Sequence, residues 1–115
     1  MGNAHLPFKG LVVALAYLGS AVTARPDLMI TNASGVRAGI TGIVSRPPNG
    51  IGVDFAVVDP TGTNVTKFTF QRSFDMKTWA DYTGTNVVTG SSSGESSDLR
   101  TSANQFYRMR LINFR

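Results

Sequence analysis

The side chains of this sequence that could perform chemistry are mainly carboxylates. A pair of them could act as general acid and base in a hydrolytic reaction, but no spacing singles out such a pair. Most lie in or beside turn-like sequence, where Asp commonly accepts hydrogen bonds from nearby backbone: Asp54, Asp59, Asp75, Asp81, Glu95 and Asp98. A calcium site would need a loop of regular ligand spacing, which is missing.

Other groups that catalysis and cofactor binding use are scarce. The chain has no cysteine and a single histidine, His5, which leaves no thiolate chemistry and no multi-histidine metal site. Neither GxGxxG nor GxxxxGK[ST] occurs, so no phosphate-binding loop is predicted. We therefore expect a protein that is not an enzyme and that takes no metal and no other cofactor.

Three arginines form the one candidate basic surface. Arg72, Arg108 and Arg110 could share an outward face and contact a nucleic acid or an acidic partner, although a solvated face paired with acidic residues is the plainer interpretation. The formal charge of +4 is spread along the chain without a basic run. Such a charge gives weak, salt-sensitive attraction to polyanions, and no specific nucleic-acid partner is predicted.

Aromatic residues offer a second candidate site. Trp79, Tyr82 and Tyr107 could form a platform for sugar rings. The alternative is that Trp79 lies on a strand as the central core residue of a sandwich, and we prefer this interpretation.

The composition favours β-structure as the scaffold for these residues. Hydrophobic residues make up 42% of the 115 residues and charged residues 16%, which predicts one folded domain rather than a disordered chain. Alternating apolar residues predict strands over 51–58, 66–73, 78–82 and 105–113, the last as an edge or closing strand of its sheet. Shorter strands are expected over 28–30 and 40–44.

Two segments are predicted to interrupt this pattern. Residues 89–98, TGSSSGESSD, have no apolar anchor and are predicted to form a polar loop. Residues 47–50, PPNG, are the strongest break. They divide the chain into 1–49, an N-terminal arm with the first short strands, and 50–115, the main β-sandwich.

The N-terminal stretch 1–24 has the layout of a secretory signal but an apolar part too short to span a membrane. We expect it instead to remain in the working protein as an apolar arm or strand. Leu11, Val13, Leu15 and Tyr17 would form one face, either in the protein's own sheet or against a neighbouring subunit.

A short stretch of sequence occurs twice, which raises the question of a repeated binding loop. TGTNVT at 61–66 returns as TGTNVV at 83–88. Because Thr-Gly-Thr-Asn supplies a positive-φ position and local hydrogen bonds, we interpret both copies as turns at strand ends.

Residues 67–111 carry a resemblance to a known class of module. Gln71, Ser73 and Asp75, then Thr78-Trp79, and finally the strand Phe106 to Leu111 make up its pattern. From Gly50 onward the chain resembles the small immunoglobulin- or fibronectin-like β-sandwich modules of phage virion proteins and secreted bacterial surface proteins. The resemblance implies an all-β antiparallel sandwich with a structural or adhesive role.

We therefore expect a virion structural protein, a coat, cement or decoration subunit located in the virion. Its expected partners are copies of itself, as a homo-oligomer, or a major capsid or tail protein. The alternative is a secreted bacterial surface or pilus-type module, with 1–24 as its export signal and with possible carbohydrate binding.

Overall fold

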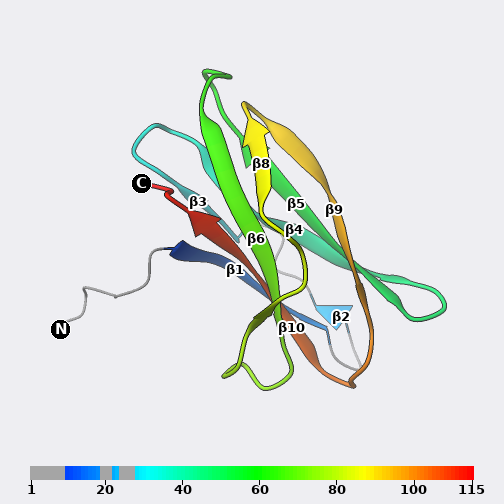
Figure 1. Cartoon of the computed structure of the whole chain (residues 1–115). Coiled ribbons are helices and arrows are strands. Elements are labelled where there is room, and N and C mark those ends of the chain that lie inside the picture. The colour runs from blue at the N-terminus through cyan, green and yellow to red at the C-terminus, as the bar shows by residue number, and fades with distance from the viewer. Residues whose placement is uncertain (1–9, 19–21, 24–27) are drawn as a thin grey trace.

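Two antiparallel β-sheets face each other in the computed structural model, which describes residues 10–18, 22–23 and 28–115 (Figure 1). The predicted fold class, an all-β sandwich, is confirmed. The strands are β1 (Gly10–Leu18), β2 (Val22–Thr23), β3 (Leu28–Thr31), β4 (Arg37–Arg46), β5 (Gly50–Val58), β6 (Val65–Ser73), β7 (Ala80–Asp81), β8 (Asn86–Thr89), β9 (Ser92–Leu99) and β10 (Gln105–Ile112).

The two sheets share the chain in an interleaved order. Sheet A runs β2-β1-β10-β6-β7, and β8 also pairs with β6. Sheet B runs β3-β4-β5-β9. The last strand, β10, which we expected as an edge or closing strand, therefore lies inside sheet A between β1 and β6. Every second residue from Gln105 to Leu111 is fully buried, and all of these except Gln105 are hydrophobic.

The core lies between the sheets and follows the predicted alternation. Val53 of β5, Met109 and Leu111 of β10 and Phe68 of β6 are fully buried, and Phe70 of β6 is nearly so. Phe55 lies 5.3 Å from the rings of both Phe68 and Phe70, measured between centroids. The strands predicted over 51–58, 66–73 and 105–113 are confirmed with small shifts at their ends.

The PPNG segment is the turn of a hairpin. β4 and β5 pair from Arg46↔Gly50 at the turn to Arg37↔Val58 at the far end. The strands on either side of 47–50 are thus neighbours in one sheet, and the division proposed at this point falls within sheet B.

The prediction of a polar loop over 89–98 is wrong. Residues 92–99 form β9, which pairs with β5 at eight successive positions. A strand can be this polar because it lies at the sheet edge, where side chains on the outer face meet water. Its inner face is lined by small residues: an added Cβ at Gly94 would lie 3.2 Å from the Phe55 ring, so Gly leaves room for that ring.

The prediction that Trp79 fills the core is also wrong. The strand expected over 78–82 is reduced to the two residues of β7, and Trp79 lies just before it, half-buried. The cause is the preceding loop, where the Asp75 carboxylate accepts hydrogen bonds from the backbone N–H groups of Lys77 and Thr78. Met76 there adopts a positive φ of 62°, which turns the chain before a longer strand can form.

Only the first TGTN copy is a turn. The interpretation of the second copy as a turn is wrong, because it links β7 to β8, and these two strands pair one after the other, in the same direction, with β6. Gly62 has the expected positive φ, 76°, whereas the φ of Gly84 is not in that range. In the first copy the Asp59 carboxylate accepts hydrogen bonds from Thr61 and Asn64. In the second, the Thr83 hydroxyl accepts the N–H of Phe70 on the neighbouring strand.

The first turn should be visible in an acid titration. Burial opposes ionisation of Asp59, but the hydrogen bonds from Asn64 and Thr61 outweigh it and lower the pKa from 3.8 to about 2. Because the folded-state pKa is lowered, the stabilising contribution is complete above pH 4 and is lost as the pH falls through 2. We expect NMR titration of the Asp59 carboxyl to show this midpoint. In Asn64→Ala the midpoint should rise, and an unchanged midpoint would contradict the assigned hydrogen bonds.

Candidate interaction surfaces

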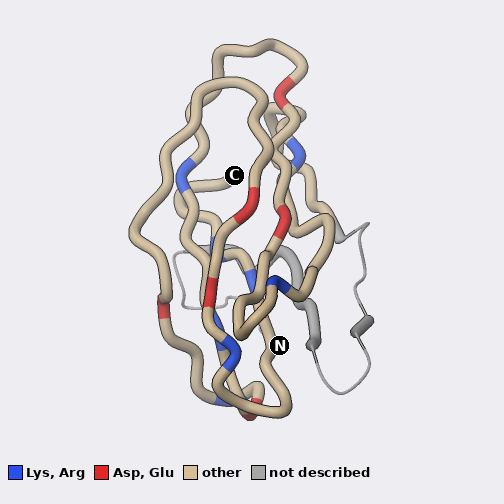
Figure 2. The backbone as a smooth tube through the Cα atoms, turned by 90° about the vertical axis from the view of Figure 1, so that its right-hand side faces the viewer, with Lys and Arg blue, Asp and Glu red and all other residues tan. Residues whose placement is uncertain are grey.

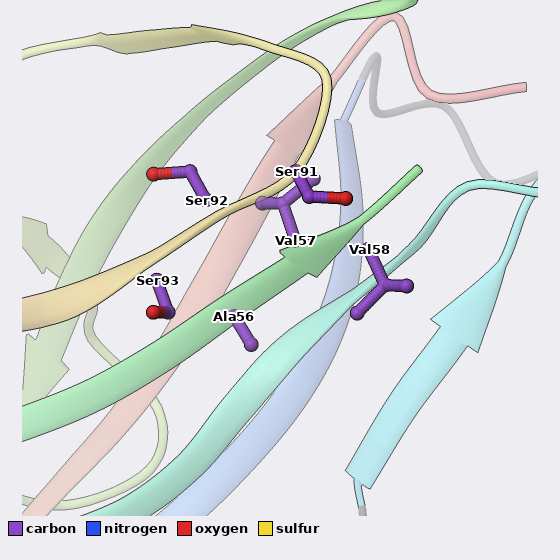
Figure 3. Close-up of a pocket in the computed structure, with 6 residues that line it drawn as sticks. All are labelled: Ala56, Val57, Val58, Ser91, Ser92 and Ser93. Atoms are coloured by element: carbon purple, nitrogen blue, oxygen red, sulfur yellow. The ribbon is translucent and has the colours of Figure 1, made fainter. Parts of the chain in front are cut away.

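Two hollows on the described surface offer little chemistry. The larger, about 340 Å³, lies where β5 ends and β9 begins (Figure 3). Its lining consists of methyl, backbone and hydroxyl groups, with no ionisable side chain: Ala56, Val57, Val58, Ser91, Ser92 and Ser93. The Ser91 hydroxyl is already engaged, since it accepts the N–H of Asp59.

The second hollow, about 160 Å³, lies beside the 74–79 loop and has charged residues in its lining. Both charges are committed to partners. Asp75 holds the loop backbone, and Arg72 forms an ion pair with Asp98. Within the described ranges no cluster of three His, Cys, Asp or Glu side chains could hold a metal ion.

A buried polar network joins the two sheets at this end of the core. Arg72 Nη1 of β6 donates to Asp98 Oδ1 of β9 at 2.7 Å, and Tyr107 Oη of β10 donates to Asp98 Oδ2 at 2.8 Å. Gln105, fully buried, donates to Tyr107 Oη and to the carbonyl of Leu99. The Asp98 side chain is only 7% exposed, so the network contains a buried carboxylate.

Ionisation of the network tyrosine is strongly disfavoured. Burial raises the pKa of Tyr107, and its hydrogen bond to Asp98 raises it further, because the phenol must keep its proton to donate. Burial likewise raises the pKa of Tyr82, whose hydroxyl pairs with Ser96 of β9. Both phenols thus stay neutral and serve as fixed hydrogen-bonding groups between the sheets.

The structure separates the three arginines that were expected on one face. Arg72 pairs in register with the buried Tyr107, so it lies on the inner side of sheet A and reaches Asp98. Arg108 and Arg110 pair with Gln71 and Thr69, on the opposite side of the sheet.

Arg108 and Arg110 belong to the outer face of sheet A, which also carries Lys67, Trp79 and Asp81. The Arg108 guanidinium lies over the Trp79 ring, with Cζ 4.2 Å from the ring centroid. Its Nε donates to Gln71 Oε1 at 2.7 Å, and Gln71 Nε2 donates to Asp81. The guanidinium is therefore fixed by stacking and by a side-chain hydrogen bond.

Burial and two neighbouring charges influence the Arg108 guanidinium. Burial lowers the pKa of Arg108, and the nearby charge of Arg110 lowers it further, while Asp81 acts in the opposite sense. Arg108 remains protonated at any physiological pH. The shift shows that Arg110 is close enough to Arg108 for their charges to interact.

The second candidate surface is the free edge of sheet B, formed by β9 and called here the β9 edge. Among the described strands none pairs with the outer side of β9. Its pairing with β5 has no bulge, and it contains neither proline nor lysine. The other strands at sheet edges, β2, β3, β7 and β8, have four residues or fewer.

The outer face of sheet B beside this edge carries an ion pair. Arg46 of β4 reaches across β5 to Glu95 of β9 in a two-pronged ion pair, with Nη2 2.6 Å from Oε1. The pair lies over Gly52, where an added Cβ would meet the Glu95 carboxylate. Acidic positions are spread along this side of the molecule, which Figure 2 views directly.

The four residues expected in assembly contacts lie on β1. In register, Leu11 pairs with Leu111, Leu15 with Arg108 and Tyr17 with Phe106, while Val13 lies at an irregularity between Val12 and Ala14. The backbone of this stretch is thus part of the protein's own sheet. The side chains of these residues lie outside the described part, as does all of His5.

Sequence reasoning missed the buried position of Asp98 and the strand β9 with its free edge. A signal was present for Arg72, because it continues the alternation of Phe68 and Phe70 and therefore belongs to the inner face. No comparable signal marks β9, whose residues are those of a loop.

No protein-family model, curated protein or solved structure matches this chain. No helix of the described part has the length and apolar character needed to cross a membrane.

Proposed function

We propose that the protein is a virion structural subunit, a coat, cement or decoration protein that acts by binding copies of itself or a shell protein. The observation that carries the proposal is the β9 edge. Eight residues of regular strand leave their outward N–H and C=O groups without a strand partner in the described structure. An open edge of this length is a template for strand addition.

The chemistry of the edge also supports a binding role. Natural edges are commonly blocked by lysine, proline, bulges or an inward-pointing charge. β9 has two charged side chains. Asp98 points inward, where it pairs with Arg72 and accepts a hydrogen bond from Tyr107, and Glu95 is paired with Arg46. The edge is therefore open to a partner without burying an unpaired charge.

Assembly through the edge can be tested by particle mass. Ser93→Lys/Ser97→Lys places two charges on exposed outer-face positions of β9 and leaves the inner face unchanged. We expect light scattering to give an assembly for the unmodified chain and a monomer for this variant. A matched control, Thr85→Lys/Ala103→Lys, adds the same charge at exposed loop positions and should still assemble. If both variants assemble alike, the β9 edge is not the contact.

The virion assignment needs a second measurement. Virus particles purified from the source by density gradient should contain peptides of this chain in the particle fraction, identified by mass spectrometry. Finding the chain only on the surface of bacterial cells, with residues 1–24 removed, would reject the virion proposal in favour of a secreted module.

A further inference from the structure

The outer face of sheet A holds a cluster of cations that the β9 edge does not use. Arg108 and Arg110 are two residues apart on β10, a separation of about 6.8 Å along a strand. Lys67 pairs with Ile112, which makes it the diagonal neighbour of Arg110 on the same face, at about 7–8 Å. The three cations therefore lie within one continuous patch.

These cations form no ion pair with another described residue, although the charge of Asp81 attracts Arg108. Of the ion pairs among described residues, one joins Arg46 to Glu95 and the other Arg72 to Asp98, so Lys67, Arg108 and Arg110 have none. The carboxylate on this face, Asp81, accepts the amide of Gln71.

A buried hydroxyl beneath the patch also lacks a partner. Thr69 is in register with Arg110, is 4% exposed and has no hydrogen-bond partner for its Oγ1. A buried polar atom is normally satisfied, so a hydroxyl without an acceptor is unusual. An anion held by Arg110 would bring oxygen acceptors to this side of the sheet.

The patch combines its charge with aromatic and apolar surface. Trp79 is half-buried under Arg108, and Val65 and Val87 of the same face are 57% and 58% exposed. A sheet face that joins cations to an aromatic ring suits single-stranded nucleic acid, because the backbone meets the cations and the bases meet the apolar groups. An acidic protein surface would use the cations but not the apolar groups.

We propose that the outer face of sheet A binds single-stranded nucleic acid through its phosphate backbone, without sequence preference. Lys67, Arg108 and Arg110 contact phosphates, and Trp79 contacts a base. This surface is separate from the β9 edge, so either proposal can fail while the other stands.

The fluorescence of Trp79 provides a direct readout, since it is the one tryptophan of the chain. Titration with oligothymidylate should change its emission, and the logarithm of the binding constant should fall with the logarithm of salt concentration at a slope of about −2 for three phosphate contacts. Lys67→Ala/Arg110→Ala should reduce the slope to about −0.7 and weaken binding at low salt at least about tenfold.

Two controls make the test specific. Arg37→Ala/Arg115→Ala removes two exposed cations elsewhere and should leave the slope and the Trp79 response as they are. Polyglutamate supplies charge without bases and should bind weakly. The proposal is overturned if oligothymidylate leaves Trp79 emission unchanged or if both double variants bind alike. Equal binding of polyglutamate would also overturn it and would assign the face to an acidic protein partner.

Discussion

Replacing Asp98 by alanine is expected to lower the free energy of unfolding by about 3–5 kcal/mol, the range for removing one partner of a buried ion pair. The change leaves the Arg72 guanidinium, 25% exposed, without its carboxylate, and leaves Tyr107 Oη without its acceptor. Urea denaturation followed by circular dichroism would measure the loss as a lower midpoint.

Glu95→Ala is the matched control for this change. It removes an acidic residue from the same strand and breaks the Arg46–Glu95 pair, whose side chains are 60% and 28% exposed. Exposed ion pairs contribute little, so this midpoint should move far less. Equal effects of Asp98→Ala and Glu95→Ala would show that burial of the network does not contribute to stability.

A double replacement tests whether Asp98→Ala destabilises the protein because it leaves an unpaired charge or because it removes side-chain volume. Arg72→Met/Asp98→Leu removes both charges together and should destabilise less than Asp98→Ala alone, because no unpaired charge stays in the sandwich. If the double variant is the less stable one, the pair stabilises the fold by its own attraction and the explanation from desolvation is wrong.

The parts of the fold that alternation defines could be predicted from sequence. In β5, β6 and β10 one face is mainly apolar and buried. The alternation of side chains therefore predicts both that the segment is a strand and which of its faces is buried. β9 could not be found in this way. Its inner side meets the core with Ser, Gly and Asp, and the signal of a strand is missing because the ring of Phe55, on the neighbouring strand β5, takes the space at Gly94.

The candidate surfaces depend on the register of neighbouring strands and on contacts between side chains of different strands. Whether Arg72 shares a face with Arg108 is decided by the register of β6 against β10, which no single strand reveals. The role of Asp98 depends on Arg72 and Tyr107, which come from two other strands. Composition could indicate an excess of cations, but only the register shows that three of them share one face.

The contrast between Phe70 and Trp79 tests which aromatic residue supports the core. Phe70 is 1% exposed, and its ring lies against Phe55, Phe68 and Tyr82, with centroids 5.3, 5.6 and 6.3 Å away. Truncating such a ring removes its apolar burial and leaves a cavity, at a cost of about 3–5 kcal/mol. Trp79→Ala should cost about 1–2 kcal/mol, since the indole is only partly buried and stacks against the Arg108 guanidinium on the outer face of sheet A.

Chemical denaturation of both variants would measure this difference. If Phe70→Ala is too unstable to purify, Phe70→Leu keeps most of the volume and should still be destabilised more than Trp79→Ala. The reverse order would mean that Trp79 fills the core. Because the larger aromatic side chain is expected to have the smaller effect, size alone cannot produce the predicted order. That order follows only if the 74–79 loop holds Trp79 on the outer face of sheet A, where it is available to a ligand.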